Sequence, residues 1–229
     1  MLAKVLAQHP IGPHENIQRI LGVNFNADRL ELFILQEFVE GSKLSELIEQ
    51  AGRIAPEQAV EYMKGIASGL AHLHAAGLCH RDLCASSIIV CKGSRTVKVS
   101  GYLARRALLP DDARVIQAPE FRSRPNFESK SGDLWCLGRI VLEMLFGGNI
   151  GRLEGTLSLV PSESLRQLCD KLLSDDPQNR PAASEITQCQ VELRKVDLNV
   201  TSHALPTTPS PKPSTPTPPS PASSTTSRY

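Results

Sequence analysis

The sequence lacks the features that would place a protein in a membrane, in the secretory pathway or on nucleic acid. No stretch of the 229 residues approaches the roughly 18 apolar residues that a membrane span needs, and the N-terminal apolar run is too short for a signal peptide. The 25 Lys and Arg residues balance 24 Asp and Glu residues, so no field of one sign points to nucleic acid or anionic lipid. We therefore expect a cytoplasmic protein with neither a membrane nor a nucleic-acid partner.

Cysteine pairs with the spacing of a zinc site or a redox motif are also missing. The six cysteines include no C-x-x-C pair, and most of them lie inside apolar segments. We expect reduced, partly buried thiols and no metal site. Cys79, Cys84 and Cys91 surround the central loop, and metal binding or oxidant sensing there stays open as an alternative, although the spacing fits no zinc pattern.

The composition changes abruptly near Asp197. Residues 197–229 consist mostly of Pro, Ser and Thr, which bury too little apolar surface to offset the entropy of ordering, so we predict a disordered tail. Its Ser-Pro and Thr-Pro pairs resemble sites for proline-directed kinases, with Ser210 as the best of them. Pro213 and Pro216 give the P-x-x-P spacing of SH3-type ligands. An inert linker is the alternative.

The first part of the chain predicts one strand and two helices. The extended apolar run Leu30–Gln36 has the length of a strand. Ser42 can cap a short helix that stops at Gly52. A longer helix is expected over Pro56–Ala76, because proline is favourable at the first helical position and an apolar stripe buries one face.

The second part predicts a hairpin and then helices. Residues 88–90 and 97–99 are short β-rich runs on either side of a turn. The segment 134–146 is apolar on nearly every face, which indicates a helix buried in the middle of the domain. Two more helices are expected, one over residues 165–172 and one from Pro181 to Leu193. Few strands followed by many helices indicate an α+β fold in which helix dominates.

Six short motifs stand in a fixed order along the chain. They are His14-Glu15-Asn16-Ile17, Glu37-Phe38-Val39-Glu40-Gly41-Ser42, His80-Arg81-Asp82-Leu83, Ala118-Pro119-Glu120, Asp133-Leu134-Trp135 with Gly138, and Asp176-Pro177 through Arg180-Pro181. The set resembles the motifs of the protein kinase family. The resemblance implies a protein-kinase-like fold over residues 1–196, with a partial N-lobe (1–40), a mostly helical C-lobe (41–196) and the disordered tail (197–229).

The retained motifs are mainly structural. The resemblance implies that Glu120 of the A-P-E triplet and Arg180 form a largely buried ion pair, which is costly to break from one side. It also places Asp133 at the start of the buried central helix. There the carboxylate is expected to accept backbone N–H bonds from the catalytic loop and to hold Arg81 in place.

Most groups that transfer phosphate in the family are absent. No G-x-G-x-x-G occurs to cover the phosphates, and Lys4 lies in what resembles the helix after the lysine strand, so we do not expect it to replace that lysine. Ser87 stands where the family has the magnesium-binding Asn, and Gly101 stands where it has the Asp of D-F-G. Cys84 and Ser86 stand where active kinases carry a helper cation.

Asp82 keeps the position of the catalytic base, and we expect it to orient the loop rather than to sustain catalysis. The adenine site also looks altered, because the polar Gln36 stands at the gatekeeper position. The candidate adenine contacts are the backbone of Glu37 and Val39 in the hinge, with Ile89 as an apolar floor. We expect no bound ATP, Mg²⁺ or other cofactor.

We therefore predict a catalytically impaired protein-kinase-like domain, a pseudokinase that acts as a binding or scaffold module in signalling. Its partners would be other proteins, bound through the C-lobe surface and the Pro-rich tail. The alternative is a weak or atypical ATP-dependent protein kinase that uses Asp82 as base together with Mg²⁺. A third reading also stays open: the sequence is a piece of a longer protein, and its strands carry an unpaired edge.

Overall fold

The computed structural model describes residues 11–26, 28–29, 31–102, 118–122, 130–148 and 153–193. All of them belong to the first of two units into which the chain divides, Met1–Arg194 and Lys195–Tyr229. Lys4 and the predicted tail, with its Ser-Pro and Thr-Pro pairs, lie outside the described residues.

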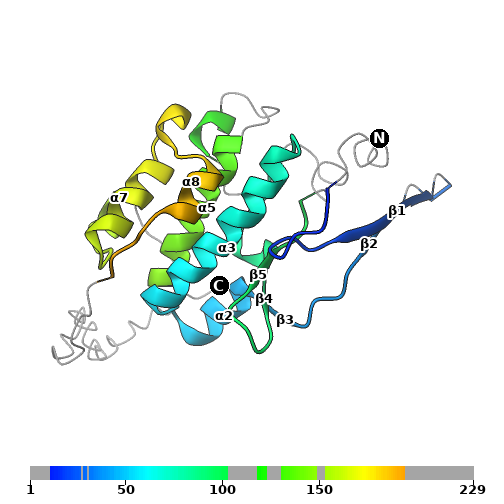
Figure 1. Cartoon of the computed structure of the whole chain (residues 1–229), viewed down its shortest axis with the longest axis horizontal. Coiled ribbons are helices and arrows are strands. Elements are labelled where there is room, and N and C mark those ends of the chain that lie inside the picture. The colour runs from blue at the N-terminus through cyan, green and yellow to red at the C-terminus, as the bar shows by residue number, and fades with distance from the viewer. Residues whose placement is uncertain are drawn as a thin grey trace, which may run out of the picture. The chain divides into compact units, whose positions relative to one another are not determined.

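A two-stranded antiparallel sheet projects from the helical body and consists of β1 (Ile20–Asn26) and β2 (Glu31–Gln36) (Figure 1). Val23 of β1 is paired with Ile34 of β2, and both side chains pack against the core. The strand β2 confirms the predicted strand. β1 was missed by the sequence analysis, because Gly22 and two asparagines interrupt its apolar alternation.

A three-stranded antiparallel sheet has the order β3 (Gly41–Lys43), β4 (Ile88–Cys91) and β5 (Val97–Val99). Alternate residues of β4 and β5 are buried, which confirms the predicted hairpin. β3 adds a strand that the sequence analysis did not predict. Gly41 is required there because a Cβ atom would collide with the carbonyl group of Val90.

Ser42 does not cap the short helix α2 (Leu44–Ala51), contrary to the prediction. Ser42 pairs with β4 and stays extended, so Lys43 is the residue directly before the helix. The carboxylate of Glu46 accepts the N–H of Lys43 at 3.3 Å, which satisfies part of the helix start. The helix ends at Gly52, whose φ of 73° lies in the left-handed region, and this end agrees with the prediction.

Two long helices, α3 (Pro56–Ala75) and α5 (Lys130–Phe146), pack against each other and form the centre of the domain (Figure 1). Pro56 is the first residue of α3, as predicted. Twelve of the 17 residues of α5 are buried, including residues on every face, so the predicted buried helix is confirmed.

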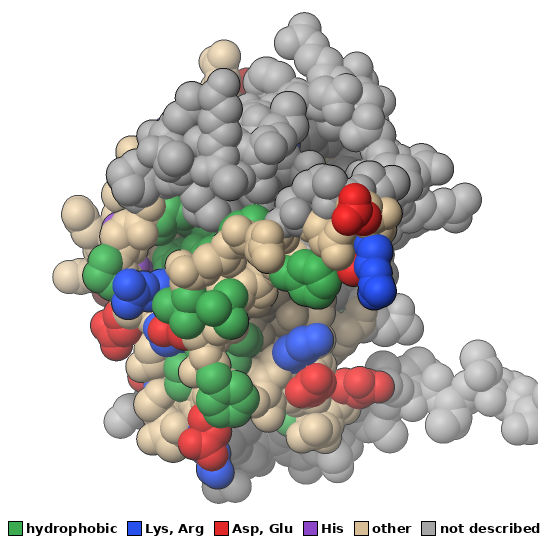
Figure 2. Space-filling view, turned by 90° about the vertical axis from the view of Figure 1, so that its right-hand side faces the viewer, with side chains coloured by type: hydrophobic (Ala, Val, Ile, Leu, Met, Phe, Trp, Pro, Cys, Tyr) green, Lys and Arg blue, Asp and Glu red, His purple; other side chains and the backbone are tan. Residues whose placement is uncertain are grey.

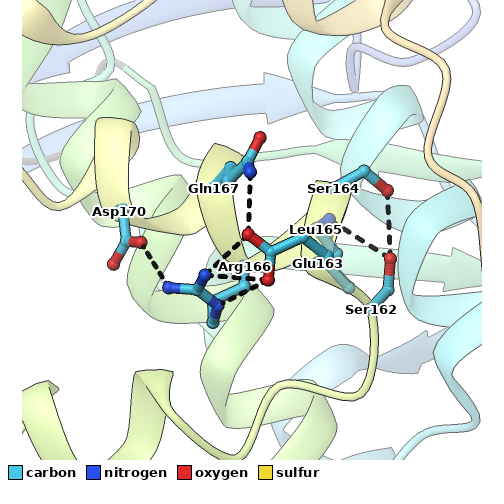
Figure 3. Close-up of polar contacts among 7 residues, drawn as sticks. All are labelled: Ser162, Glu163, Ser164, Leu165, Arg166, Gln167 and Asp170. Atoms are coloured by element: carbon cyan, nitrogen blue, oxygen red, sulfur yellow. Dashed lines mark hydrogen bonds and ion pairs between the residues drawn. The ribbon is translucent and has the colours of Figure 1, made fainter.

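The helix α7 (Glu163–Leu172) follows the short helix α6 (Leu153–Leu157) and confirms the helix predicted over 165–172. Ser162 caps α7, because its Oγ accepts the N–H of Leu165 at 3.3 Å (Figure 3). On the exposed side of α7, Arg166 lies between two carboxylates, within 3.3 Å of each (Figure 3). Such exposed pairs contribute little to stability.

The last helix, α8 (Ala183–Gln188), is shorter than the predicted helix from Pro181 to Leu193. The backbone is already extended at Cys189, with ψ at 137°. Beyond it, the N–H of Glu192 donates to the hydroxyl of Ser164 at 3.0 Å. This bond to a side chain takes the place of a hydrogen bond that a longer helix would supply to the N–H of Glu192.

All six cysteines are free thiols, which agrees with the predicted reduced state. Burial raises the pKa of the Cys169 thiol to about 12, so this group stays protonated and packs as a small apolar side chain. Within the described ranges, no helix combines the length and the apolar character that crossing a membrane requires.

Gly138 of α5 lies directly against α7, since a Cβ there would stand 2.9 Å from Leu172 Cβ and 3.0 Å from the Leu173 side chain. We expect Gly138→Ala to lower the free energy of unfolding by about 1–3 kcal/mol through overpacking. Gly155 in α6 is the matched control, because a Cβ there meets nothing within 4 Å. Gly155→Ala should raise stability by about 0.5–1 kcal/mol. Urea unfolding followed by circular dichroism measures both, and equal midpoints for Gly138→Ala and the unmodified protein would contradict the packing.

Candidate active site

Asp133, near the start of α5, lies at the centre of the candidate active site. Its Oδ2 accepts the backbone N–H of His80 at 2.8 Å, and its Oδ1 accepts that of Arg81 at 2.9 Å. Oδ2 also lies 2.9 Å from Nε2 of His74 at the end of α3. Asp133 is 3% exposed, and the low local dielectric strengthens these hydrogen bonds. The predicted contact between Asp133 and the catalytic loop is confirmed.

The catalytic loop is strained at Arg81, whose φ of 69° makes it the one non-glycine residue with positive φ among the described residues. The hydrogen bond from its N–H to Asp133 stabilises this conformation. The neighbouring ring of His80 donates from Nε2 to the carbonyl of Ser100 at 2.8 Å, and its Nδ1 accepts the N–H of Asp82 at 3.3 Å. Burial lowers the pKa of His80, so the ring is neutral, as one donor and one acceptor require.

A buried ion pair joins Glu120, in the short 3-10 helix η2 (Pro119–Arg122), to Arg180. Their two parallel hydrogen bonds measure 2.6 and 2.9 Å. Arg180 also donates to the carbonyl groups of Ser174 and Ser131, each at 3.0 Å, and its side chain is 0% exposed. The predicted buried ion pair is confirmed, and it fixes three segments of the C-lobe to one another.

Ser87 and Gly101 lie next to each other in the site. Ser100, directly before Gly101, donates its N–H and its hydroxyl to the carbonyl of Ser87, at 2.8 and 2.9 Å. The Ser87 hydroxyl is bonded within its own turn, where it donates to the carbonyl of Cys84 at 2.8 Å and accepts the N–H of Cys84 at 3.1 Å. Gly101 has a φ of 77°, and a Cβ there would meet no atom within 4 Å. The space for a side chain is therefore present, and the sequence supplies none.

The oxygen donors of this loop do not fit a magnesium ion. Mg²⁺ needs near-octahedral oxygen coordination, which proteins usually anchor with carboxylates. The loop offers the carboxylate of Asp82, while the hydroxyl of Ser87 already bonds to Cys84 and Gly101 has no side chain. In the described part of the chain, no group of three or more His, Cys, Asp and Glu side chains is arranged to hold a metal. The role of Asp82 as a base stays a prediction.

Glu37, a predicted adenine contact, has protein partners at its side chain and at both backbone groups. Its carboxylate lies 2.8 Å from Nζ of Lys98 and accepts the N–H of Arg19 at 3.2 Å. Its own N–H donates to the carbonyl of Arg19 at 2.9 Å, and its carbonyl accepts from Nε2 of Gln18 at 3.0 Å. Burial acts to raise the pKa of Glu37, but the hydrogen bond and charge of Lys98 outweigh it and lower the pKa.

The other two predicted adenine contacts are partly exposed. Ile89 pairs with Lys98 across the sheet, on the face of β4 opposite to the buried Ile88 and Val90. Val39 is half-buried in the segment between β2 and β3. The structure thus brings both Ile89 and Glu37 next to Lys98. An adenine ring at this position would compete with Gln18 for the Glu37 carbonyl, and the adenine site stays a prediction.

A buried tyrosine ring and a stacked pair of histidine rings complete the surroundings. Tyr102, which follows Gly101, is 5% exposed, and burial raises its pKa to about 12, so the phenol stays neutral. It lines a pocket of about 280 Å³ together with Ile17 and eight other residues. Nearby, His14 stacks on His72 with ring centroids 4.6 Å apart. Burial and then the charge of His72 lower the pKa of His14.

Sequence reasoning missed three residues that shape the site, namely His74, Lys98 and Gln18. His74 contacts Asp133, and no motif in the sequence marked this histidine. Lys98 could have been found, because it alternates with the apolar Val97 and Val99 and must lie on the opposite face of β5. Gln18 carried no signal, since its bond to Glu37 depends on the pairing of β2 with β1, a strand that the sequence did not predict.

The sequence and the fold of this chain both match known proteins. The family model of the protein kinase domain matches residues 3–191. The chain is 25% identical over 207 residues to the probable serine/threonine-protein kinase HSL1 of Saccharomyces cerevisiae, covering 82% of this chain and 14% of that protein. It is 28% identical over 202 residues to the serine/threonine-protein kinase SAPK3 of Oryza sativa, covering 76% of this chain and 59% of that protein.

Among solved structures, Rad53 1-466 in complex with AMP-PNP matches with a TM-score of 0.67 and 23% identity, covering 82% of this chain and 53% of that chain. This match shows the fold. The chain spans less than two thirds of each of these three proteins.

We expect Asp133→Asn to lower the free energy of unfolding by about 3 kcal/mol. The amide nitrogen cannot accept a hydrogen bond, so a buried N–H of His80 or Arg81 would lose its partner. Asp170→Asn on the exposed side of α7 is the control and should change stability by less than about 0.5 kcal/mol. Urea unfolding measures both, and a similar midpoint for the two variants would show that Asp133 is not the anchor of the loop.

Stability should also fall as the pH drops from about 7 to about 5. His80 and His14 have pKa values lowered below the ordinary 6.5, so over this range the unfolded chain binds more protons than the folded one. Melting temperatures across this pH range test the effect. His14→Gln should reduce the slope and leave the share of His80, whereas a flat profile in the unmodified protein would argue against neutral, buried rings.

Proposed function

Because the chain belongs to the protein kinase family, we propose that it is a catalytically impaired member, a pseudokinase that acts as a binding or scaffold module in signalling. The observation that supports this most strongly is the pair Ser87 and Gly101. Phosphoryl transfer depends on cations that neutralise charge on the transferred group, and protein kinases hold those cations with an Asn and an Asp at these two places. Here one position has a hydroxyl engaged in its own turn, and the other has no side chain.

The retained ion pairs suit a domain that presents a fixed surface. Asp133 and the Glu120–Arg180 pair hold the loop, α5 and the end of the A-P-E motif through protein contacts. The proposed partners are other proteins, which bind the C-lobe surface and the Pro-rich tail of residues 197–229 in the cytoplasm. A tail with SH3-type or proline-directed kinase motifs would add a second contact to the same partner or to another one.

The rival function is a weak or atypical protein kinase with Asp82 as base. The observation in its favour is the intact geometry of the loop, in which Asp82 follows the anchored residues His80 and Arg81. Such an enzyme would have to bind ATP and a divalent cation with the reduced donor set described above. Nucleotide binding therefore separates the two functions.

A thermal melt of the full chain tests the proposal. We expect the same melting temperature without nucleotide and with millimolar ATP plus Mg²⁺ or Mn²⁺, because a ligand that binds the folded state would raise it. A metal-dependent rise of several degrees would favour the rival enzyme. In that case an assay of phosphotransfer with Asp82→Asn as the matched variant decides whether the carboxylate works as a base.

The double variant Ser87→Asn, Gly101→Asp tests whether these two positions carry the loss. Position 101 has room for a side chain, and Asp tolerates its left-handed backbone better than most residues. We expect this variant to gain a metal-dependent rise in melting temperature with ATP. Ser87→Asn, Gly101→Asn has the same size without the carboxylate and should not gain it. No rise in either variant would place the loss elsewhere in the nucleotide site.

A further inference from the structure

A pocket of about 510 Å³ lies on the helical part of the domain, where the end of α3 meets the starts of α5 and α8. These helices lie together in Figure 1, and α3 packs against both of the others. The volume falls within the roughly 300–1,000 Å³ of binding pockets. Asp82, Glu37 and Ile89 are not among the described residues that line it. We call it the α3–α5–α8 pocket, and it is built from other residues than the catalytic and adenine positions.

Small side chains form most of the apolar wall of the α3–α5–α8 pocket. They are Ala71 and Ala75 of α3 and Ala182 and Ala183 at the start of α8, and Leu134 of α5 adds a larger apolar surface. Because protein interiors are close-packed, alanines on two neighbouring helices leave room that larger side chains would fill. The space suits an aliphatic side chain that a partner inserts.

One buried polar group also lines the pocket. The side chain of His74 is 9% exposed, and its Nε2 lies 2.9 Å from the carboxylate of Asp133. Because an ionised carboxylate only accepts hydrogen bonds, Nε2 carries the proton of this bond. In the part of the chain that the structure describes, the other ring nitrogen, Nδ1, has no hydrogen-bond partner and is not one of the fully enclosed polar atoms. Nδ1 therefore touches open space, and the pocket is the space that this ring lines.

The pocket carries a cation without a matching acid. Lys130, in the first turn of α5, lines it and is exposed. Among the described residues, no Asp or Glu lines the pocket and no ion pair holds Lys130. Arg180 also lines it, but this side chain is 0% exposed and is paired with Glu120. A lysine in the first turn opposes the helix dipole, and a residue that breaks a local rule without compensation is expected at a functional site.

The charge of the pocket is a local feature. On the side of the molecule from which the hairpin projects, basic and acidic side chains lie next to one another among hydrophobic ones (Figure 2). The whole sequence is also balanced, with 25 basic and 24 acidic residues. An apolar pocket with a lysine and no acid is therefore complementary to an apolar group that is flanked by negative charge.

We propose that the α3–α5–α8 pocket docks an acidic peptide segment of a partner protein. An aliphatic side chain of the peptide lies between the alanines, and a neighbouring carboxylate of the peptide lies at Lys130. When the ring of His74 is neutral, its Nδ1 accepts a backbone N–H of the peptide. The contact is smaller than a standard interface, so we expect a dissociation constant of about 10–1,000 μM. The inference deepens the proposed function and rests on it for the expectation that the C-lobe binds proteins.

NMR of the full chain with isotope-labelled alanine methyl groups tests the site, because four alanines line it. The acidic probe is the end-blocked peptide Glu-Glu-Leu-Leu-Glu-Glu, and the basic probe is Lys-Lys-Leu-Leu-Lys-Lys. The acidic probe should shift the methyl signals of Ala71, Ala75, Ala182 and Ala183. The signal of Ala51, which is exposed at the end of α2 and does not line the pocket, should stay unchanged. The basic probe should shift none of them.

Lys130→Glu tests the charge recognition. This variant should weaken binding of the acidic probe at least about tenfold and should bind the basic probe instead. Glutamate agrees with the helix dipole at this position, so the fold should be retained, with an unchanged circular dichroism spectrum. Lys171→Glu is the matched control, because Lys171 lies in the last turn of α7, is exposed, and does not line the pocket. It makes the same change in net charge and should leave binding of both probes unchanged.

Three results would overturn the proposal. They are an acidic probe that shifts no lining alanine at about 1 mM, equal binding of both probes, and binding that Lys130→Glu leaves intact. None of these measurements involves nucleotide. The pocket can therefore fail while the impaired catalysis stands, and a melting temperature raised by ATP and metal would overturn the impaired catalysis without changing the result for the pocket.

Discussion

The buried carboxylate of Asp133 is the interaction on which the rest of the candidate site depends. It accepts hydrogen bonds from two successive backbone N–H groups and contacts His74, so one side chain joins α5, the end of α3 and the loop at His80. A charge at this depth is stable only while its partners stay in place. The strained backbone at Arg81 is held by its bond to Asp133, and His80 is held by its bond to Ser100.

Fold and chemistry rest on different residues in this domain. Asp133 and the Glu120–Arg180 pair are buried, and each holds several segments together, so their loss would be felt throughout the C-lobe. Ser87 closes a single turn, and Gly101 has open space around it. Changes at these two positions disturb few neighbours. The difference explains how a chain with the protein kinase fold can carry Ser87 and Gly101 at these positions without loss of that fold.

The sequence predicted the parts of the fold that depend on local pattern. Proline at the start of α3, the apolar run of β2 and the all-round apolar character of α5 are signals of this kind. The Glu120–Arg180 ion pair and the contact of Asp133 with the loop followed from ordered motifs. The errors concern features set by distant partners. Ser42 is held in a strand by β4, and α8 ends early because Glu192 bonds to a hydroxyl of α7. Gln18 meets Glu37 at the end of the β1–β2 pair, and β1 was not predicted.

The left-handed backbone and free space at Gly101 have an evolutionary consequence. A glycine codon that ends in a pyrimidine becomes an aspartate codon through one base change, and a Cβ there would meet no neighbouring atom within 4 Å. The cost of reversion is therefore limited to the left-handed backbone, about 1–2 kcal/mol for a residue with a side chain. A glycine that persisted at this position in descendants of the gene would therefore be maintained by selection and not by lack of space for the aspartate side chain.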